Sequence, residues 1–345
     1  MIEVADLRKE YEGFVAVEGS TFSVSPGEVF GIVGPNGAGK TTTLKMLAGL
    51  VEPTDGTASV TGRDAGDVET RRDLGFVPEE SPLYEEMTAD GYLRFFADLY
   101  DVPRSVADER VASALDRLGL EHRGRRIGDM SKGMKRKVAI ARALVNDPDV
   151  LIFDEPASGL DPLTTNRVVE FTRELGAEGR TVVFSAHNLY HVESVCDRVV
   201  VMDRGEIIAR GSVEEVRAEH GTTEYHVYTT VELPEGEATA NGRHRRTVTS
   251  MTAVESVREA ARAAGGEVVD IRTHEPSLEE IFLEIAGETP TGTVQSGPDR
   301  DGAGPDGGPS RHDGDATAGP EEAARGDREA ETPSEPSAVD GTGEP

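Results

Sequence analysis

The clearest chemical pattern in this chain is a loop suited to binding phosphate groups. Residues 34–41 fit the pattern G-x-x-x-x-G-K-[ST] at every fixed position, between an apolar strand-like run at 29–33 and a helical pattern at 42–50. Its glycines let several backbone N–H groups point at one spot, and the helix start adds partial positive charge there. The residues expected to bind phosphates are Gly34, Pro35, Asn36, Gly37, Ala38, Gly39, Lys40, Thr41 and Thr42.

A second apolar run, at 150–153, ends in two adjacent carboxylates, Asp154 and Glu155. Such a run suits a buried parallel strand, and α/β sheets place ligands at the carboxyl ends of such strands. Asp154 could hold Mg²⁺, with the Thr41 hydroxyl as a further ligand, while Glu155 could polarise an attacking water. A carboxylate pair after a strand is often only a solvated turn, but beside a phosphate loop it predicts phosphoryl chemistry.

A third pattern is the basic segment at 131–137, Ser-Lys-Gly-Met-Lys-Arg-Lys, which precedes a helical run at 138–144. Ser131 is a good helix N-cap, and the free N–H groups of such a helix end can bind an anion. From the residues alone, an anion site and an ordinary capped basic helix remain equally open.

These patterns need an alternating α/β scaffold to bring them together. Residues 1 to about 215 alternate between strand and helix patterns, and about 88–145 lacks strand signals and reads as helical. Residues 221–287 predict a separate small α+β domain, and 288–345, rich in Gly, Pro, Asp, Glu, Ser and Thr, predict a disordered acidic tail. The expected strands of the first part are 2–7, 20–24, 29–33, 74–77, 150–153, 181–185 and 198–202.

Composition excludes several classes of protein. The chain has 345 residues, 36% of them apolar, with no run long enough to span a bilayer and no basic-then-apolar start typical of a secretory signal. We therefore expect a cytoplasmic location. The single cysteine, Cys196, excludes an internal disulfide and is expected to be a small buried hydrophobe.

The charge balance is strongly acidic, at −29. Residues 288–345 hold 14 acidic and 4 basic residues, a balance of −10, which leaves −19 for the first 287 residues. Basic residues are mostly arginine, with only six lysines. Such a surface argues against nucleic-acid binding and is typical of proteins from a salt-rich, halophilic cytoplasm, although an ordinary solvated surface would also explain it.

The order of these patterns resembles the nucleotide-binding subunit of an ATP-binding-cassette (ABC) transporter. The phosphate loop, the Ser131 segment, the Asp154–Glu155 strand, Ser-Gly-Leu-Asp-Pro at 158–162 and a histidine at 187 occur in the family's order across residues 1–215. The resemblance implies a P-loop NTPase fold, with a RecA-like core and a helical subdomain. It also implies that Tyr11 stacks on adenine, that Asp161 belongs to the D-loop and that His187 contacts the γ-phosphate.

The resemblance further implies a mechanism in which two cassettes pair head to tail. ATP on the phosphate loop of one would be covered by Ser131 and Gly133 of the other, with Glu155 as general base and Asp154 organising Mg²⁺. Closing and reopening of the pair would move a membrane partner. The expected activity is therefore ATP hydrolysis.

This chain departs from the family pattern at several positions. The signature, usually Leu-Ser-Gly-Gly-Gln, is Met-Ser-Lys-Gly-Met at 130–134, and the switch glutamine is replaced by Glu79. An ionised glutamate can face Mg²⁺ or water but cannot donate a hydrogen bond. Residues 88–91 also lack the glutamate of a capping box, so a looser helix start is expected there.

The variant motifs and the end of the small domain, 275–283, resemble the ABC-2 exporter branch of the family. That branch implies a separately encoded integral membrane permease, docked around 79–100, and a peripheral position on the inner face of the cell membrane. Tyr84, Leu93, Phe95 and Phe96 are candidate contacts, unless they form a buried helix face. The second cassette could be a copy of this chain or a sister subunit.

Three other functions remain open from the sequence. A soluble ABC-type ATPase acting on ribosomes usually has two cassettes, and this chain has one phosphate loop. In ABC-type ATPases that act on DNA, a long coiled coil separates the phosphate loop from the signature segment. Here only 91 positions separate Lys40 of the loop from Ser131 of the signature. A cassette that binds nucleotide without hydrolysis is disfavoured by Glu155.

Overall fold

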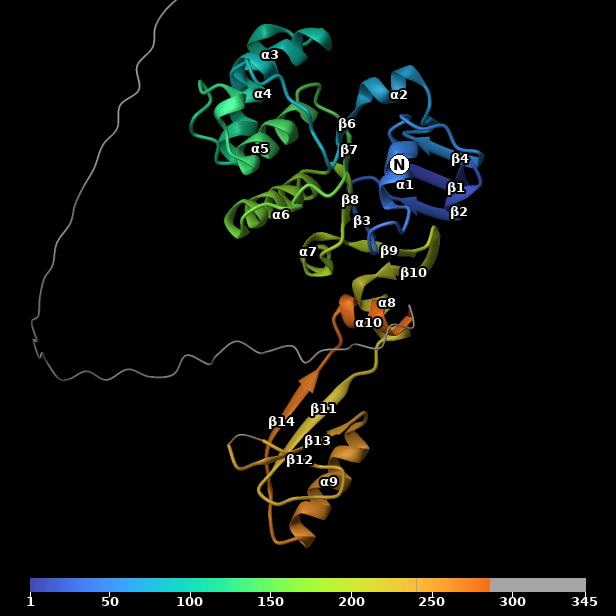
Figure 1. Ribbon diagram of the computed structural model, residues 1–345, viewed down its shortest axis with the longest axis vertical. Coiled ribbons are helices and arrows are strands. Elements are labelled where there is room, and N and C mark those ends of the chain that lie inside the picture. The colour runs from blue at the N-terminus through green and yellow to red at the C-terminus, as the bar shows by residue number, and fades with distance from the viewer. Residues whose placement is uncertain (240, 286–345) are drawn as a thin grey trace, which may run out of the picture. The chain divides into compact units, whose positions relative to one another are not determined.

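Residues 1–239 and 241–285 are described by the computed structural model, and they form three sheets with helices packed against them (Figure 1). This is the α/β architecture expected for an ABC cassette. The last predicted residues of the small domain, 286–287, and the predicted disordered tail, 288–345, lie outside the described residues.

The central sheet has the strand order β10-β9-β3-β8-β7-β6, parallel except for β10. Successive residues of β3 and β7 enter two different hydrophobic clusters, one on each face of the sheet. Both faces are covered, which explains why these strands are continuously apolar. The strands are β3 (Val29–Val33), β6 (Leu74–Val77), β7 (Val150–Phe153), β8 (Thr181–Ala186), β9 (Arg198–Asp203) and β10 (Glu206–Ser212).

An antiparallel sheet, β2-β1-β4-β5, shares one of these clusters with the helix after the phosphate loop, α1 (Lys40–Leu47). Its strands are β1 (Ile2–Tyr11), β2 (Phe14–Val24), β4 (Asp55–Val60) and β5 (Arg63–Asp64). The first two are longer than predicted, and the other two were not predicted. A Cβ on Gly56, which has a φ of 77°, would lie 2.2 Å from the Asp6 carbonyl oxygen, so β4 needs a glycine that weakens its strand signal.

The region predicted to be helical contains α3 (Ala89–Leu99), α4 (Arg104–Arg117), the short 3₁₀ turn η1 (Ile127–Asp129) and α5 (Lys132–Ala143). Thr88 caps α3 by accepting a 3.1 Å hydrogen bond from the Gly91 N–H, although Gly91 cannot return the second bond of a capping box. Ser131 caps α5 in the same way, at 3.3 Å from the Met134 N–H. The sequence therefore predicted both helix starts.

The remaining helices are short or lie against the central sheet. They are α2 (Val68–Asp73), α6 (Pro162–Ala177), α7 (Leu189–Val195) and α8 (Val213–His220). Cys196, at the end of α7, packs against the cluster that contains α6 and α7, and burial raises the pKa of its thiol. The thiol therefore behaves as the small hydrophobe expected.

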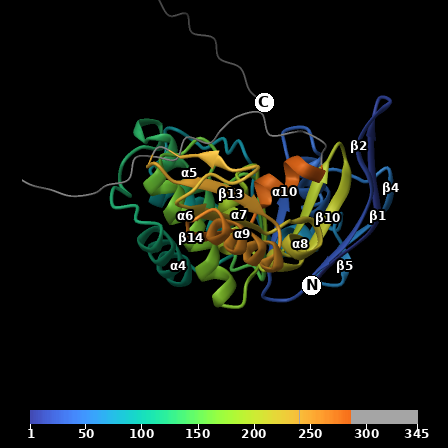
Figure 2. The ribbon, with the colours of Figure 1, turned by 90° about the horizontal axis from the view of Figure 1, so that it is seen from below.

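Residues 224–274 form a sheet of order β12-β13-β11-β14, with α9 (Met251–Ala263) packed through Val254, Val257 and Ala261. Its strands are β11 (Glu224–Thr229), β12 (Glu237–Ala238), β13 (His244–Val248) and β14 (Val268–His274). The predicted capping box opens α10 (Leu278–Ile285), with Ser277 and Glu280 bonded in both directions at 2.8 and 3.2 Å. This helix lies beside α8 (Figure 2).

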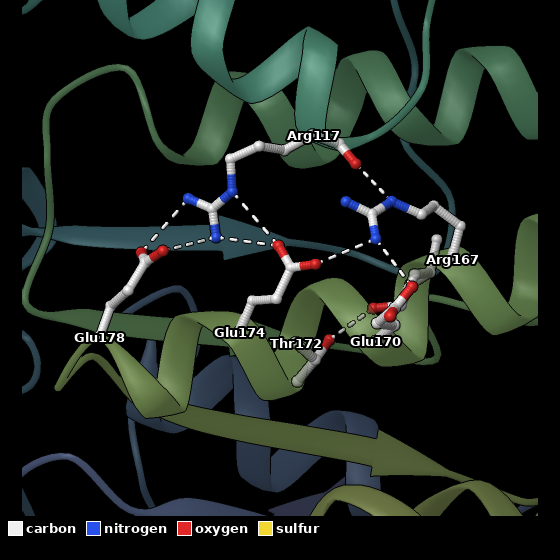
Figure 3. A network of polar contacts seen from close by, with 7 residues as sticks. Arg117, Arg167, Glu170, Thr172, Glu174 and Glu178 are labelled. Carbon is white, nitrogen blue, oxygen red and sulfur yellow. Dashed lines mark hydrogen bonds and ion pairs between the residues drawn. The ribbon is translucent and has the colours of Figure 1, made fainter.

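Arginine and glutamate side chains join the end of α4 to α6 (Figure 3). Arg117 pairs with Glu174 at 3.1 Å and with Glu178 at 2.8 Å, and Arg167 pairs with Glu174 at 3.0 Å. The Arg117 guanidinium also lies 4.7 Å from the centre of the Phe171 ring. Glu174 therefore bridges the helical region and a helix of the central sheet.

We predict that Glu174→Gln lowers the free energy of unfolding by about 1 kcal/mol, because it weakens two partly exposed ion pairs that share one carboxylate. Chemical denaturation at fixed salt measures the change. The matched control is Glu255→Gln, which affects one pair within a single helix, with Arg258. A loss for Glu174→Gln no larger than that of the control would contradict a bridging role.

Candidate active site

The phosphate loop has a backbone conformation that needs glycine at particular positions. Gly34, Gly37 and Gly39 have φ angles of 149°, 86° and 101°. A Cβ on Gly34 would lie 2.1 Å from the Met202 carbonyl oxygen, and one on Gly39 would lie 2.5 Å from that of Ala16. Two of the loop's glycines are therefore required for space as well as for conformation.

Lys40 is the first residue of α1 and is only 5% exposed. Its ammonium group donates to the carbonyl oxygens of Gly34 at 2.8 Å and Pro35 at 3.2 Å. It also lies 3.3 Å from Oε1 of Glu155, whose side chain is equally buried. The loop thus holds a buried cation beside a carboxylate that follows β7, two strands away from β3 in the sheet.

Asp154 follows β7 and is completely buried. Its Oδ1 accepts hydrogen bonds from Ser185 Oγ at 2.8 Å and from Thr41 Oγ1 at 3.2 Å, whereas its Oδ2 is buried with no partner. Burial raises the pKa of this carboxyl, and the hydrogen bonds from Ser185 and Thr41 oppose that effect. An unpartnered buried carboxylate oxygen is the group that a cation would satisfy.

Glu155 has a left-handed backbone, with a φ of 46°, and its N–H donates to Ser185 Oγ at 2.9 Å. Its Oε2 lies 2.7 Å from Nδ1 of His187, which follows β8. The structure therefore brings Lys40, Glu155 and His187 into direct contact from three separate elements. This is an arrangement in which a carboxylate base is oriented from both sides.

A hollow of about 400 Å³ lies over the loop. It combines the predicted phosphate-binding residues 35–42 with the predicted Glu79 and Glu155, and it is also lined by Phe14 and Ala16. Gly34, the first residue of the loop, is not among the residues that line the hollow. This hollow is large enough for part of a nucleotide and has the groups that a triphosphate requires.

Other predicted site residues lie together but away from this hollow. Ser131 caps α5, Asp161 caps α6 by accepting from the Thr164 N–H at 3.0 Å, and a Cβ on Gly133 would lie 3.1 Å from the Thr164 side chain. The hydrogen bonds from Thr164 lower the pKa of Asp161. The starts of α5 and α6 therefore form a second group of predicted residues, separate from the residues that line the hollow.

The sequence interpretation overlooked two residues near the hollow. Tyr11, the predicted adenine contact, is 42% exposed with the Lys9 ammonium 5.0 Å from its ring centre, while Phe14, 65% exposed, lines the hollow. An aromatic just after the Glu12–Gly13 turn was the available signal. The second is Arg136, which the sequence interpretation counted only as one charge of the basic segment 131–137. Its burial on α5 had no local signal, since lysines flank it on both sides.

The residues present fit a magnesium ion. Among the described residues, no group of three His, Cys, Asp or Glu side chains could hold a metal alone. Magnesium commonly takes one or two carboxylates and completes its shell with water and substrate phosphates. Asp154, with its unpartnered Oδ2, and the neighbouring Thr41 hydroxyl match that requirement.

Comparison with known proteins agrees with this geometry. Residues 17–158 match the family model for ABC transporter. The linearmycin resistance ATP-binding protein LnrL of Bacillus subtilis is 32% identical over 84% of this chain and 99% of that protein. The chain belongs to the ABC transporter ATP-binding subunits. It is therefore an ATP-hydrolysing transporter ATPase with an ATP-binding cassette.

Two further comparisons extend this finding. The Nod factor export ATP-binding protein I of Burkholderia orbicola is 40% identical over 61% of this chain and 70% of that protein. The structure titled as the dimeric post-hydrolysis state of the cassette MJ0796, bound to ADP and Pi, has a TM-score of 0.57 and is 26% identical, covering 61% of this chain and 98% of that one. In the part of this ATPase that the structure describes, each helix is too short or too polar to cross a membrane.

We predict that Asp154→Asn stabilises the chain without nucleotide by about 1 kcal/mol at neutral pH, because it removes a buried charge that lacks a full set of partners. Because the pKa of Asp154 is raised on folding, the folded state binds a proton at this carboxyl more tightly than the unfolded state does. This difference stabilises the folded state at low pH. That contribution is lost as pH rises above the unfolded value of 3.8. The gain from the substitution should therefore shrink toward acidic pH.

Denaturation curves at several pH values test this, with Asp203→Asn at the end of β9 as the control. A gain that is independent of pH would contradict the role of the charge. Asp154→Asn should also bind ATP no more tightly with Mg²⁺ than without it, as measured by calorimetry.

Proposed function

We propose that this chain is the ATPase subunit of an exporter of the ABC-2 type, powering a separately encoded integral membrane permease. The observation that carries the proposal is the hollow in which the phosphate loop, Lys40 and Glu155 meet. Export is supported by relatives whose names concern linearmycin resistance and Nod factor export. Residues 1–215 would be the ATPase domain, with 88–145 as its helical subdomain and 221–287 as a small C-terminal domain.

In this proposal the loop N–H groups and Lys40 bind the triphosphate of ATP, and Phe14 or Tyr11 contacts the base. Asp154, Thr41 and Glu79 would hold Mg²⁺, which supplies positive charge for the developing negative charge on the phosphates. Glu155 accepts a proton from the attacking water, and His187 holds the Glu155 carboxylate from the side opposite Lys40 and contacts the γ-phosphate. Lys40 must then share its charge between Glu155 and the phosphates.

A second cassette completes the proposed site. Ser131, Gly133 and Asp161 gather at the starts of α5 and α6 and do not line the hollow of their own chain. We propose that they serve the ATP of a partner cassette, either a copy of this chain or a sister subunit. The dimeric structure of the similar cassette MJ0796 supports such pairing.

The proposed permease contact is a cluster of aromatic side chains around α3. Tyr84 and Phe95 have ring centres 6.0 Å apart and are both exposed, whereas Leu93 is fully buried and Phe96 is half-buried. Of the four residues predicted as permease contacts, two therefore lie on the surface and two pack toward the core. An exposed aromatic pair fits an apolar partner, and we propose a peripheral position on the inner face of the cell membrane.

We expect Glu155→Gln to lower ATP turnover at least ~100-fold while leaving MgATP affinity within a few-fold, because the amide cannot accept the proton from water. Turnover is measured by phosphate release, and affinity by calorimetry at high salt. Glu178→Gln, a surface change just after α6, serves as the control. Unchanged turnover in Glu155→Gln would show that Glu155 is not the base.

A double variant, Tyr84→Asp with Phe95→Asp, is expected to release the chain from membranes, because each change places a charge in the proposed apolar contact. Sedimentation of tagged chain with native membranes measures this, and turnover of the purified chain should change less than ~3-fold. Val68→Asp, at an exposed apolar side chain on α2, is the control. Cosedimentation of the wild-type chain with ribosomes or DNA in place of membranes would favour the soluble alternative.

A halophilic, haloarchaeal source is also part of the proposal, supported by the charge of −29 and the six lysines. We predict that the melting temperature rises as KCl is raised from about 0.1 to about 1 M, because the screening length falls from about 10 to about 3 Å. Sucrose at equal osmotic concentration should stabilise the chain less. Equal stability with and without salt would rule out salt adaptation.

A further inference from the structure

Arg136 is a charged side chain in the buried face of α5, only 6% exposed. Its guanidinium donates from Nη1 to the carbonyl oxygen of Pro78 at 2.7 Å and from Nη2 to that of Glu79. Both acceptors belong to the backbone that follows β6. The helix capped by Ser131 is therefore hydrogen-bonded, through Arg136, to the segment that carries Glu79.

A buried guanidinium must be compensated, because desolvating a cation is costly. Burial lowers the pKa of Arg136, and the negative charges of Glu79, Asp154 and Glu155 oppose that effect. The positive charge of Arg136 thus acts on the carboxylates of the proposed active site through space, although its hydrogen bonds go to backbone carbonyls and it does not line the hollow itself. Lys40 faces one of these carboxylates, Glu155, from the phosphate loop.

The same segment is attached to α5 a second time, at the surface. Lys135 pairs with Glu85 at 2.7 Å, and the Glu85 carbonyl oxygen accepts from the Gly128 N–H at 2.9 Å. Lys135 and Glu85 are partly exposed, so their ion pair contributes little on its own. The buried contact of Arg136 is therefore the stronger attachment of residues 78–87 to α5.

We propose that Arg136 is a positioning residue of this ATPase: it fixes the Glu79 segment to the helix capped by Ser131 and supplies the positive charge that lets a glutamate occupy the switch position. This inference rests on the proposed function, because it assigns Arg136 to the site that Glu79 and Ser131 serve there. Movement of residues 78–87 is transmitted through the guanidinium to α5, and so to the residues proposed to cover ATP on the partner cassette.

The test compares Arg136→Gln, Arg136→Lys, Glu79→Gln and the double change Arg136→Gln with Glu79→Gln in the full chain. Arg136→Gln should lower kcat about tenfold while the KM for ATP changes less than threefold, because Arg136 positions a segment without touching the nucleotide. Removing the Glu79 charge as well should recover only the part of the loss that comes from the uncompensated carboxylate, because the carbonyls of Pro78 and Glu79 still lack their donors. The double variant should therefore be less active than Glu79→Gln, but by clearly less than tenfold. Arg136→Lys keeps the charge and should retain more activity than Arg136→Gln.

A second readout does not depend on activity. Cleavage by a glutamate-specific protease within 79–86 should be at least threefold faster in Arg136→Gln, because the carbonyls of Pro78 and Glu79 lose their donors. The control is Arg142→Gln on the same helix, whose guanidinium donates to Tyr92 Oη at 3.1 Å and does not reach the segment. The control should leave both cleavage and kcat close to the wild type.

Two results would overturn the inference. One is additive losses of kcat in the double variant, because they would mean that Arg136 and Glu79 act independently. The other is equal effects of Arg136→Gln and Arg142→Gln on cleavage, kcat and melting temperature, because that would indicate a merely structural arginine. A wild-type chain that binds no ATP would instead refute the proposed function, so the two failures can be told apart.

Discussion

The structure depends on a small set of buried charges at the carboxyl end of β7. Asp154 and Glu155 are carboxylates taken out of water: Ser185 and Thr41 bond to one oxygen of Asp154, and His187 lies against one oxygen of Glu155. Of the other two oxygens, Oδ2 of Asp154 has no partner and Oε1 of Glu155 has only its ion pair with Lys40. Buried charges of this kind are costly unless they are paired in good geometry. Each of the surrounding elements, β3, α1, β6, β8 and α5, therefore has to be held in place with some accuracy.

The hydrophobic core provides that accuracy. Alternate residues of β3 and β7 enter clusters on opposite faces of the sheet, so a shift of either strand by one residue would exchange its contacts with both layers. Glycines allow close approach where backbone passes over the phosphate loop, as at Gly34 beside Met202. The strands that end in the site are thus fixed in register before any ligand binds.

The second group of functional residues is organised by α5. This helix is capped by Ser131, contains the buried Arg136, and borders the aromatic cluster near α3. A movement of the Glu79 segment can therefore shift α5, and with it Ser131 and Gly133, which are proposed to face a second cassette. That arrangement suits a protein in which ATP hydrolysis must be coupled to movement elsewhere.

The sequence alone determined the phosphate loop, the buried strands β3, β6 and β7, and the helix caps at Ser131 and Ser277, because these rest on local pattern and short-range hydrogen bonds. It missed β4, β5, β10, β12 and β13; Gly56 weakens the signal of β4, and a short Arg-Gly turn brings β10 back against β9. Tertiary structure alone decided which aromatic lines the hollow, that Asp154 keeps an unpartnered oxygen, and that Arg136 reaches Pro78 and Glu79. Contacts between groups that lie far apart in the sequence, such as Asp154 and Ser185 or Arg136 and Pro78, depend on how the layers pack, and no local pattern encodes them.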